Sequence, residues 1–124
     1  MSIAYLNGAW QPLEETRIPV LDRGFLFGDG VYEVIPVYSG KPFRLKRHLE
    51  RLENNLAAIR IDKPLSHEEW DAIIQRLIED HGPVDQELYL QVTRGVAPKR
   101  DHAFPADTTP TVFAMTNPLP KPDP

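Results

Sequence analysis

Two stretches of the chain repeat apolar residues at alternating spacings of three and four, the pattern of a helix with one buried side. The first stretch predicts a helix over residues 45–59, and the second predicts a helix over about 67–81. Ser66 followed by Glu69 forms a capping-box pattern before the second helix, and Gly82-Pro83 ends it. The two apolar stripes are Leu45, Leu49, Leu52, Leu56 and Ile59, then Trp70, Ile73, Ile74, Leu77 and Ile78.

Shorter segments alternate apolar and polar residues or are rich in β-branched and aromatic side chains, which is typical of strands. Asn7-Gly8 and Ser39-Gly40 are turn dipeptides and predict two hairpins. Pro36 lacks a backbone donor, so it favours a sheet edge or a bulge. The expected strands are 4–6 with 9–10, 31–38 with 41–44, and the neighbours 88–93 and 111–116.

This order of elements predicts an α+β fold, a mostly antiparallel sheet with two helices packed on one face. A chain of 124 residues has room for one such domain, which we expect over residues 1–117. From Pro118 onward every second residue is proline, so residues 118–124 are expected to form an extended linker.

Composition excludes several classes of function. No apolar run approaches the roughly 20 residues of a membrane span, and no secretory signal is visible, so we expect a cytoplasmic location. The net charge of −4 argues against a nucleic-acid partner. With no cysteine and no metal-ligand spacing among the histidines and acids, we predict no metal site.

Arg51 is the first candidate for binding a ligand. The residues three and four positions away on its helix are Arg47, His48, Asn54 and Asn55, so no acid on that helix neutralises it. We therefore expect its guanidinium to be free to bind an anion. The ordinary alternative is a solvated surface arginine.

Two further candidates come from a strand and a loop. Strand alternation places Tyr32 and Val34 on one face of the sheet and Glu33 on the other, although Tyr32 also fits a core position. In the long loop after Gly95, Arg100 and His102 can both donate to one carboxylate. The alternative for that loop is a solvated turn in which Asp101 forms a salt bridge.

Three segments of the sequence resemble the N-terminal domain of the D-amino acid aminotransferases, class IV enzymes of fold type IV. They are residues 22–34 (DRGFLFGDGVYEV), 48–52 (HLERL) and 100–105 (RDHAFP). The resemblance implies pyridoxal 5'-phosphate (PLP) as cofactor, with Arg51 binding its phosphate. It also implies that Tyr32 donates to the substrate carboxylate and Val34 lines the pocket, while Arg100 and His102 reach the active site of the partner subunit in a homodimer.

The same resemblance implies transfer of an amino group between a D-amino acid, such as D-alanine, and a 2-oxo acid. The family's PLP-binding lysine lies in a second domain, and no lysine here matches it, so residues 1–124 alone hold no catalytic residue and are expected to be inactive. Branched-chain aminotransferases and aminodeoxychorismate lyases share the fold and remain alternatives. A non-catalytic, self-associating α+β module is a third.

Overall fold

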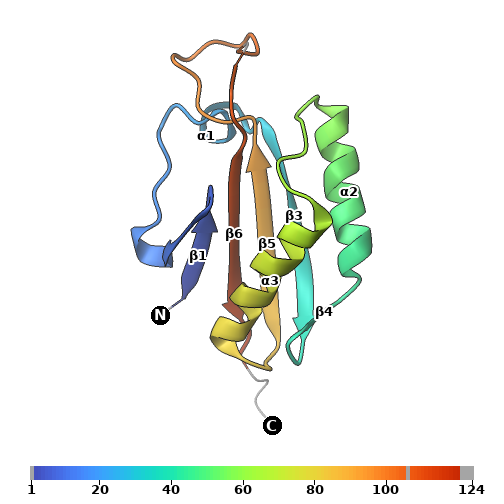
Figure 1. The fold of residues 1–124 in the computed structure, drawn as a ribbon. Helices are drawn as coiled ribbons and strands as arrows, with labels where there is room; N and C mark the ends of the chain where they lie inside the picture. Colours follow the sequence, from blue (N-terminus) through green and yellow to red (C-terminus); the bar gives the residue numbers. More distant parts are fainter. Residues whose placement is uncertain (1, 106, 121–124) are drawn as a thin grey trace.

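The computed structural model describes residues 2–105 and 107–120. It has one six-stranded antiparallel sheet of order β2-β1-β6-β5-β3-β4, with two long helices on one face (Figure 1). The predicted α+β fold is confirmed. The strands are β1 (Ile3–Leu6), β2 (Ala9–Pro12), β3 (Gly30–Tyr38), β4 (Lys41–Pro42), β5 (Gln86–Thr93) and β6 (Thr111–Pro118); the helices are α1 (Arg23–Phe27), α2 (Leu45–Ala58) and α3 (His67–His81), and Leu13–Glu15 forms a 3-10 turn.

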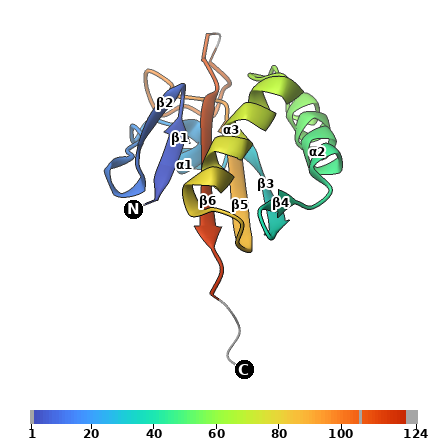
Figure 2. The ribbon, with the colours of Figure 1, turned by 60° about the horizontal axis from the view of Figure 1, so that its bottom comes forward.

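The hydrophobic core lies between the sheet and helices α2 and α3, which cross the same face side by side (Figure 2). Both predicted helices are confirmed, although α2 ends at Ala58, one residue early. The capping box of Ser66 and Glu69 is formed in both directions. Burying each large apolar side chain contributes roughly 1.5–3 kcal/mol. The largest fully buried apolar residues are Trp70, Ile35, Leu49, Leu52, Leu56, Ile74, Leu77, Leu88 and Leu90.

The predicted strand pairs are also confirmed. Asn7 and Gly8 both have positive φ, at 50° and 90°, and close the β1–β2 hairpin. Strands β5 and β6 are neighbours over their full length. The carbonyl oxygen of Pro36 accepts from the Phe43 N–H on the side of β3 where β4 pairs with only two residues. The Pro36 nitrogen, which has no hydrogen to donate, therefore lies on the side of β3 toward the sheet edge, as expected.

The glycines of residues 24–30 are typical of a turn, but the segment before β3 contains a short helix. It contains α1, whose N-cap is Asp22, and Gly28 ends the helix with a φ of 63°. A Cβ atom on Gly24 would lie 2.2 Å from Cγ2 of Thr93 on β5. Only glycine therefore allows α1 to pack this closely against the end of the sheet.

The opposite face of the sheet carries no long helix among the residues that the structure describes (Figure 1). The strand β6 continues to Pro118, so the sheet includes the first residue of the expected linker, whose end at residues 121–124 lies outside the described residues. Within the part of the chain that the structure describes, no helix has the length and apolar character to cross a membrane.

Candidate functional site

Tyr32 and Val34 share the face of the sheet that α2 and α3 leave open, as strand alternation predicts. Tyr32 is 63% exposed and Val34 is 38% exposed. The ring of Tyr32 stacks on Tyr89 with 5.8 Å between centroids, and Tyr89 in turn lies 6.3 Å from Phe113. Tyr32 is therefore a surface aromatic at one end of a row of rings, not a core residue.

Tyr32 also lines a hollow of about 240 Å³ beside α1, together with Gly24, Gly28 and Gly30. A Cβ on Gly30 would come within 2.5 Å of the Val92 carbonyl oxygen, so the backbone packs too closely there for another residue. Among the described residues the Tyr32 hydroxyl has no hydrogen-bond partner, whereas the Tyr89 hydroxyl donates to Oε1 of Gln91 at 2.6 Å. The hydroxyl of Tyr32 is thus available to an incoming ligand.

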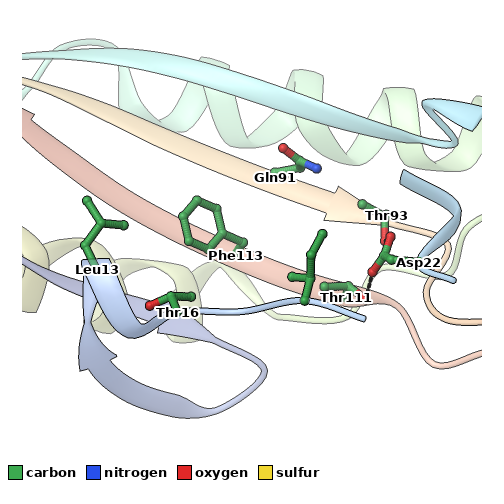
Figure 3. Close-up of a pocket in the computed structure, with 8 residues that line it drawn as sticks. Leu13, Thr16, Asp22, Gln91, Thr93, Thr111 and Phe113 are labelled. Carbon is green, nitrogen blue, oxygen red and sulfur yellow. Dashed lines mark hydrogen bonds between the residues drawn. The ribbon is translucent and has the colours of Figure 1, made fainter. Parts of the chain in front are cut away.

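A second pocket lies next to this hollow, between β5, β6 and the segment that leads to α1 (Figure 3). It has a volume of about 260 Å³ and none of the predicted site residues line it. Asp22 is fully buried at one end, where it accepts from the hydroxyls of Thr93 at 2.8 Å and Thr111 at 2.6 Å. Because the Asp22 carboxylate is satisfied by the protein, it serves to join α1 to the sheet.

Arg100 and His102 converge on one aromatic ring. The Arg100 guanidinium lies 5.2 Å from the centroid of Phe27, and the His102 ring lies 5.0 Å from it. Their loop stands at the end of the sheet where α1 sits (Figure 1). The carboxylate of Asp101 accepts from the Ala103 N–H at 3.1 Å, and among the described residues it forms no ion pair. The alternative of a turn with an Asp101 salt bridge is therefore not observed.

The structure brings Arg100 and His102 together but does not join them to Tyr32. No hydrogen bond or ring contact between described residues links Tyr32 to Arg100 or His102. Tyr32 is on β3, while Arg100 and His102 lie on the loop after β5. Within one copy of the chain the three residues therefore form two separate groups at the same end of the sheet.

Arg51 is not free of acids, and the expectation that it is free was wrong. Its Nε and Nη2 donate to Oε2 and Oε1 of Glu33 at 2.8 and 2.7 Å, and His48 Nδ1 lies 2.7 Å from Oε1 of the same carboxylate. Neighbours along the helix could not reveal this pair, because Glu33 belongs to β3. Glu33 faces α2, so Arg51 and Tyr32 lie on opposite sides of β3.

The ion pair with Glu33 leaves one nitrogen of the Arg51 guanidinium without a hydrogen bond among the described residues. Burial alone would raise the pKa of Glu33, which is 2% exposed, but hydrogen bonds from Arg51 and His48 outweigh it and hold that pKa below its ordinary value. The hydrogen bonds to Glu33 raise the pKa of Arg51. The Arg51 side chain is 63% exposed, and its Nη1 makes no hydrogen bond among the described residues. One end of the guanidinium can thus still meet an anion.

A buried group that sequence analysis did not find lies behind the loop of Arg100. Arg23 and Arg94 both donate through Nε to Oδ2 of Asp29, at 2.8 and 2.7 Å. Burial alone would raise the pKa of Asp29, but the two arginines lower it overall. The sequence pattern assigns no role to Arg23 or Arg94. Arg94 is 65 residues from Asp29, so no local pattern marks that contact.

Within residues 2–105 and 107–120, no group of three or more His, Cys, Asp or Glu side chains is arranged to hold a metal ion. Donors gather at Arg51, at the Tyr32 hydroxyl and at the Arg100 and His102 pair. All three places suit anionic groups such as carboxylate or phosphate.

Comparison with known proteins assigns the family. Residues 30–124 match the model of amino-transferase class IV, and the chain belongs to that family. It is 43% identical over 117 residues to a D-alanine aminotransferase of Bacillus licheniformis and 36% identical over 123 residues to one of Staphylococcus epidermidis. The matches cover 94% and 98% of this chain but 41% and 43% of those relatives. The chain thus spans less than half the length of either relative.

Solved structures agree on the fold. A 4-amino-4-deoxychorismate lyase of Pseudomonas aeruginosa matches with a TM-score of 0.74 and 31% identity, covering 94% of this chain and 40% of that one. A branched-chain aminotransferase of Thermoproteus uzoniensis, solved with norvaline, matches with a TM-score of 0.82 and 24% identity, covering 97% and 41%. The latter likeness bears on the fold alone.

Proposed function

We propose that this chain forms the N-terminal part of a PLP-dependent transaminase that moves an amino group between a D-amino acid, such as D-alanine, and a 2-oxo acid. The observation that carries the proposal is the convergence of Arg100 and His102 on the ring of Phe27. Two donors held at one ring suit the two oxygens of a carboxylate. Identity of 43% to a D-alanine aminotransferase supports the choice of substrate class.

In this proposal the substrate carboxylate is bound from two directions. The Tyr32 hydroxyl donates from the open face of the sheet, and Val34, two residues along the same strand, forms part of the pocket wall. Arg100 and His102 donate from the loop of a second subunit in a homodimer, which is compatible with their separation from Tyr32 within one chain. With the amino group held at the cofactor, a fixed carboxylate would set which face of the α-carbon is open to proton removal.

Arg51 fits the phosphate of PLP in chemistry, because Nη1 of its exposed guanidinium is uncommitted among the described residues while Glu33 orients the group. Bound PLP supplies an electron sink for the pair of electrons left when the α-proton is removed. The lysine that would bind the cofactor is proposed to lie outside these 124 residues. A cytoplasmic location is part of the same proposal.

A second candidate is another class IV activity. The chain is 31% identical to a 4-amino-4-deoxychorismate lyase, and its fold also matches that of a branched-chain aminotransferase. These likenesses support lyase or branched-chain aminotransferase activity as the alternative. D-alanine, L-leucine and 4-amino-4-deoxychorismate are therefore compared as substrates. A non-catalytic, self-associating domain would turn over none of them in any form of the protein.

The experiment uses the protein that contains this chain together with its lysine-bearing part. Arg100→Ala is expected to raise the KM for D-alanine about 10- to 100-fold, since a charge-assisted hydrogen bond contributes about 1.5–3 kcal/mol. Its matched control is Lys99→Ala, which removes the neighbouring exposed cation. An unchanged KM in Arg100→Ala refutes the proposal that Arg100 binds the substrate carboxylate. Residues 1–124 alone are expected to show no transaminase activity.

A further inference from the structure

We propose that Arg23 is a positioning residue, which fixes the loop that presents Arg100 and His102. Its Nη1 donates to the carbonyl oxygen of Asp101 at 2.6 Å and to that of Ala103 at 3.4 Å, and its Nη2 donates to the carbonyl oxygen of His102 at 3.3 Å. One guanidinium thus binds three successive carbonyls of a segment about 80 residues away in sequence.

The guanidinium is itself held from behind. Arg23 is 3% exposed, and its Nε donates to Asp29 at 2.8 Å. Asp29 also binds Arg94, whose Nη2 donates to the carbonyl oxygen of Ile59 at 2.7 Å and whose Nη1 donates to that of Arg60 at 3.3 Å. The loop is therefore tied through two arginines and one carboxylate to the end of helix α2 and so to the core.

Aromatic rings cover both arginines. The Arg23 guanidinium lies 4.7 Å from the centroid of Phe27 and 5.6 Å from that of Phe104, and Arg94 lies 4.0 Å from Phe104. Phe27 is the same ring that Arg100 and His102 contact. Arg23 thus contacts both the backbone of the loop and the Phe27 ring, against which the side chains of Arg100 and His102 lie.

This arrangement requires arginine. The charges of Arg23 and Arg94 are met by one carboxylate and by backbone carbonyls, which suit a planar fork with five donors. A lysine offers a single ammonium group and cannot reach Asp29 and three carbonyls at once. The described part of the loop between Gly95 and Thr111 has no helix or strand of its own, and no other distant described side chain donates to residues 101–103.

The consequence for activity rests on the proposed function, in which Arg100 and His102 bind the substrate carboxylate. A loosened loop must be ordered at the cost of binding energy each time a substrate binds, so affinity falls while the chemical step is unchanged. Arg23 touches neither substrate nor cofactor in this scheme and acts only through the loop.

The first test measures order in the loop of the 124-residue chain by ¹⁵N relaxation. In Arg23→Lys the backbone order parameters of residues 101–103 are expected to fall from about 0.85 to below about 0.6. The matched control is Arg17→Lys, an exposed arginine that also donates to carbonyls, those of Glu14 and Thr16, but remote from this loop. Unchanged order in Arg23→Lys overturns the proposal.

Phe104→Ala keeps the test decisive if Arg23→Lys does not fold. Phe104 is 63% exposed, so its loss is compatible with folding, yet it uncovers Arg23 and Arg94. It is expected to loosen the same residues in part, because the three hydrogen bonds from Arg23 remain. A loop that is already mobile in the parent protein, with order parameters of residues 101–103 below about 0.6, overturns the proposal.

The second test measures KM and kcat for D-alanine in the protein that contains this chain. Arg23→Lys is expected to raise KM about tenfold with kcat within about twofold of the parent, and Arg17→Lys to change neither. A loosened loop with unchanged KM, in a protein where Arg100→Ala does raise KM, overturns the positioning role. If Arg100→Ala has no effect, the proposed function fails instead, and the relaxation result still decides whether Arg23 holds the loop.

Discussion

Arg51 on helix α2 and Glu33 on strand β3 form a two-point ion pair, with Nε to Oε2 at 2.8 Å and Nη2 to Oε1 at 2.7 Å. The pair fixes the direction of the guanidinium, because both nitrogens that it engages lie on one edge. The carboxylate is buried, but the arginine is exposed. The pair thus differs from that of Asp29, whose two arginines are themselves buried.

That difference predicts that neutralising Asp29 lowers the free energy of unfolding more than neutralising Glu33 does. Asp29→Asn leaves Arg23 and Arg94 buried without their acid and is expected to lower the free energy of unfolding by about 3–5 kcal/mol. Glu33→Gln is expected to cost less, because Arg51 can turn toward water. Urea unfolding of both variants measures the difference, with Glu50→Gln on the exposed side of α2 as control. A larger loss in Glu33→Gln would contradict this account.

Stability is expected to fall on the acid side. The pKa values of Asp29, Glu33 and Glu53 are lowered from ordinary values of 3.8, 4.5 and 4.5. Burial opposes ionisation of each, but the hydrogen-bond partners outweigh it. The partners of Asp29 and Glu33 are those described above, and those of Glu53 are His67 and Lys63. The unfolded chain then takes up protons before the folded one does, so this stabilisation is complete above about pH 4.5 and is lost as pH falls through the lowered pKa values.

The urea midpoint measured from pH 7 down to pH 3 checks this expectation. Asp29→Asn should give a shallower fall between pH 5 and pH 3 than the parent, because one of the three linked groups no longer titrates. A midpoint that stays constant over that range in the parent would contradict the assignment of these ion pairs.

The sequence predicted the long elements well because their signals are local. The stripe of Leu49, Leu52 and Leu56 has the helical period, and each of these residues is buried against the sheet. Helix α1 was not predicted, because five residues make little more than one turn and glycine at its second position disfavours a helix. It forms because Asp22 caps it and because its backbone packs against β5.

The candidate site was harder to predict, since its contacts join distant segments. Alternation correctly separated Tyr32 from Glu33, which is a local property of a strand. The partner of Arg51 could not be read from its helix, because 18 residues separate it from Glu33. The anchoring of the loop by Arg23 spans about 80 residues and depends on backbone carbonyls, which every residue has and no sequence pattern marks.

The capping box at the start of α3 offers a test of a feature that the sequence did predict. The Ser66 hydroxyl accepts from the Glu69 N–H at 3.1 Å, and the Glu69 side chain accepts from the Ser66 N–H at 3.0 Å. Ser66→Ala is expected to lower the free energy of unfolding by about 1 kcal/mol, while Ser66→Asp retains it. Thermal or urea unfolding checks both variants, and equal losses in the two would argue against a capping role.

The last prediction compares two tyrosines that stack on each other. The hydroxyl of Tyr89 donates to Gln91, whereas that of Tyr32 has no partner among the described residues. Tyr89→Phe is therefore expected to cost about 0.5–1.5 kcal/mol of unfolding free energy, and Tyr32→Phe is expected to cost nothing measurable.

The KM for D-alanine should change in the reverse order, more in Tyr32→Phe than in Tyr89→Phe. If the Tyr32 hydroxyl binds the substrate carboxylate, Tyr32→Phe raises the KM for D-alanine about fivefold or more in the protein that contains this chain, since a net hydrogen bond contributes about 1 kcal/mol or more. Tyr89→Phe should leave KM within about twofold. A Tyr32→Phe variant with the parent's KM would show that this hydroxyl, although exposed and unpaired among the described residues, has no part in binding the substrate.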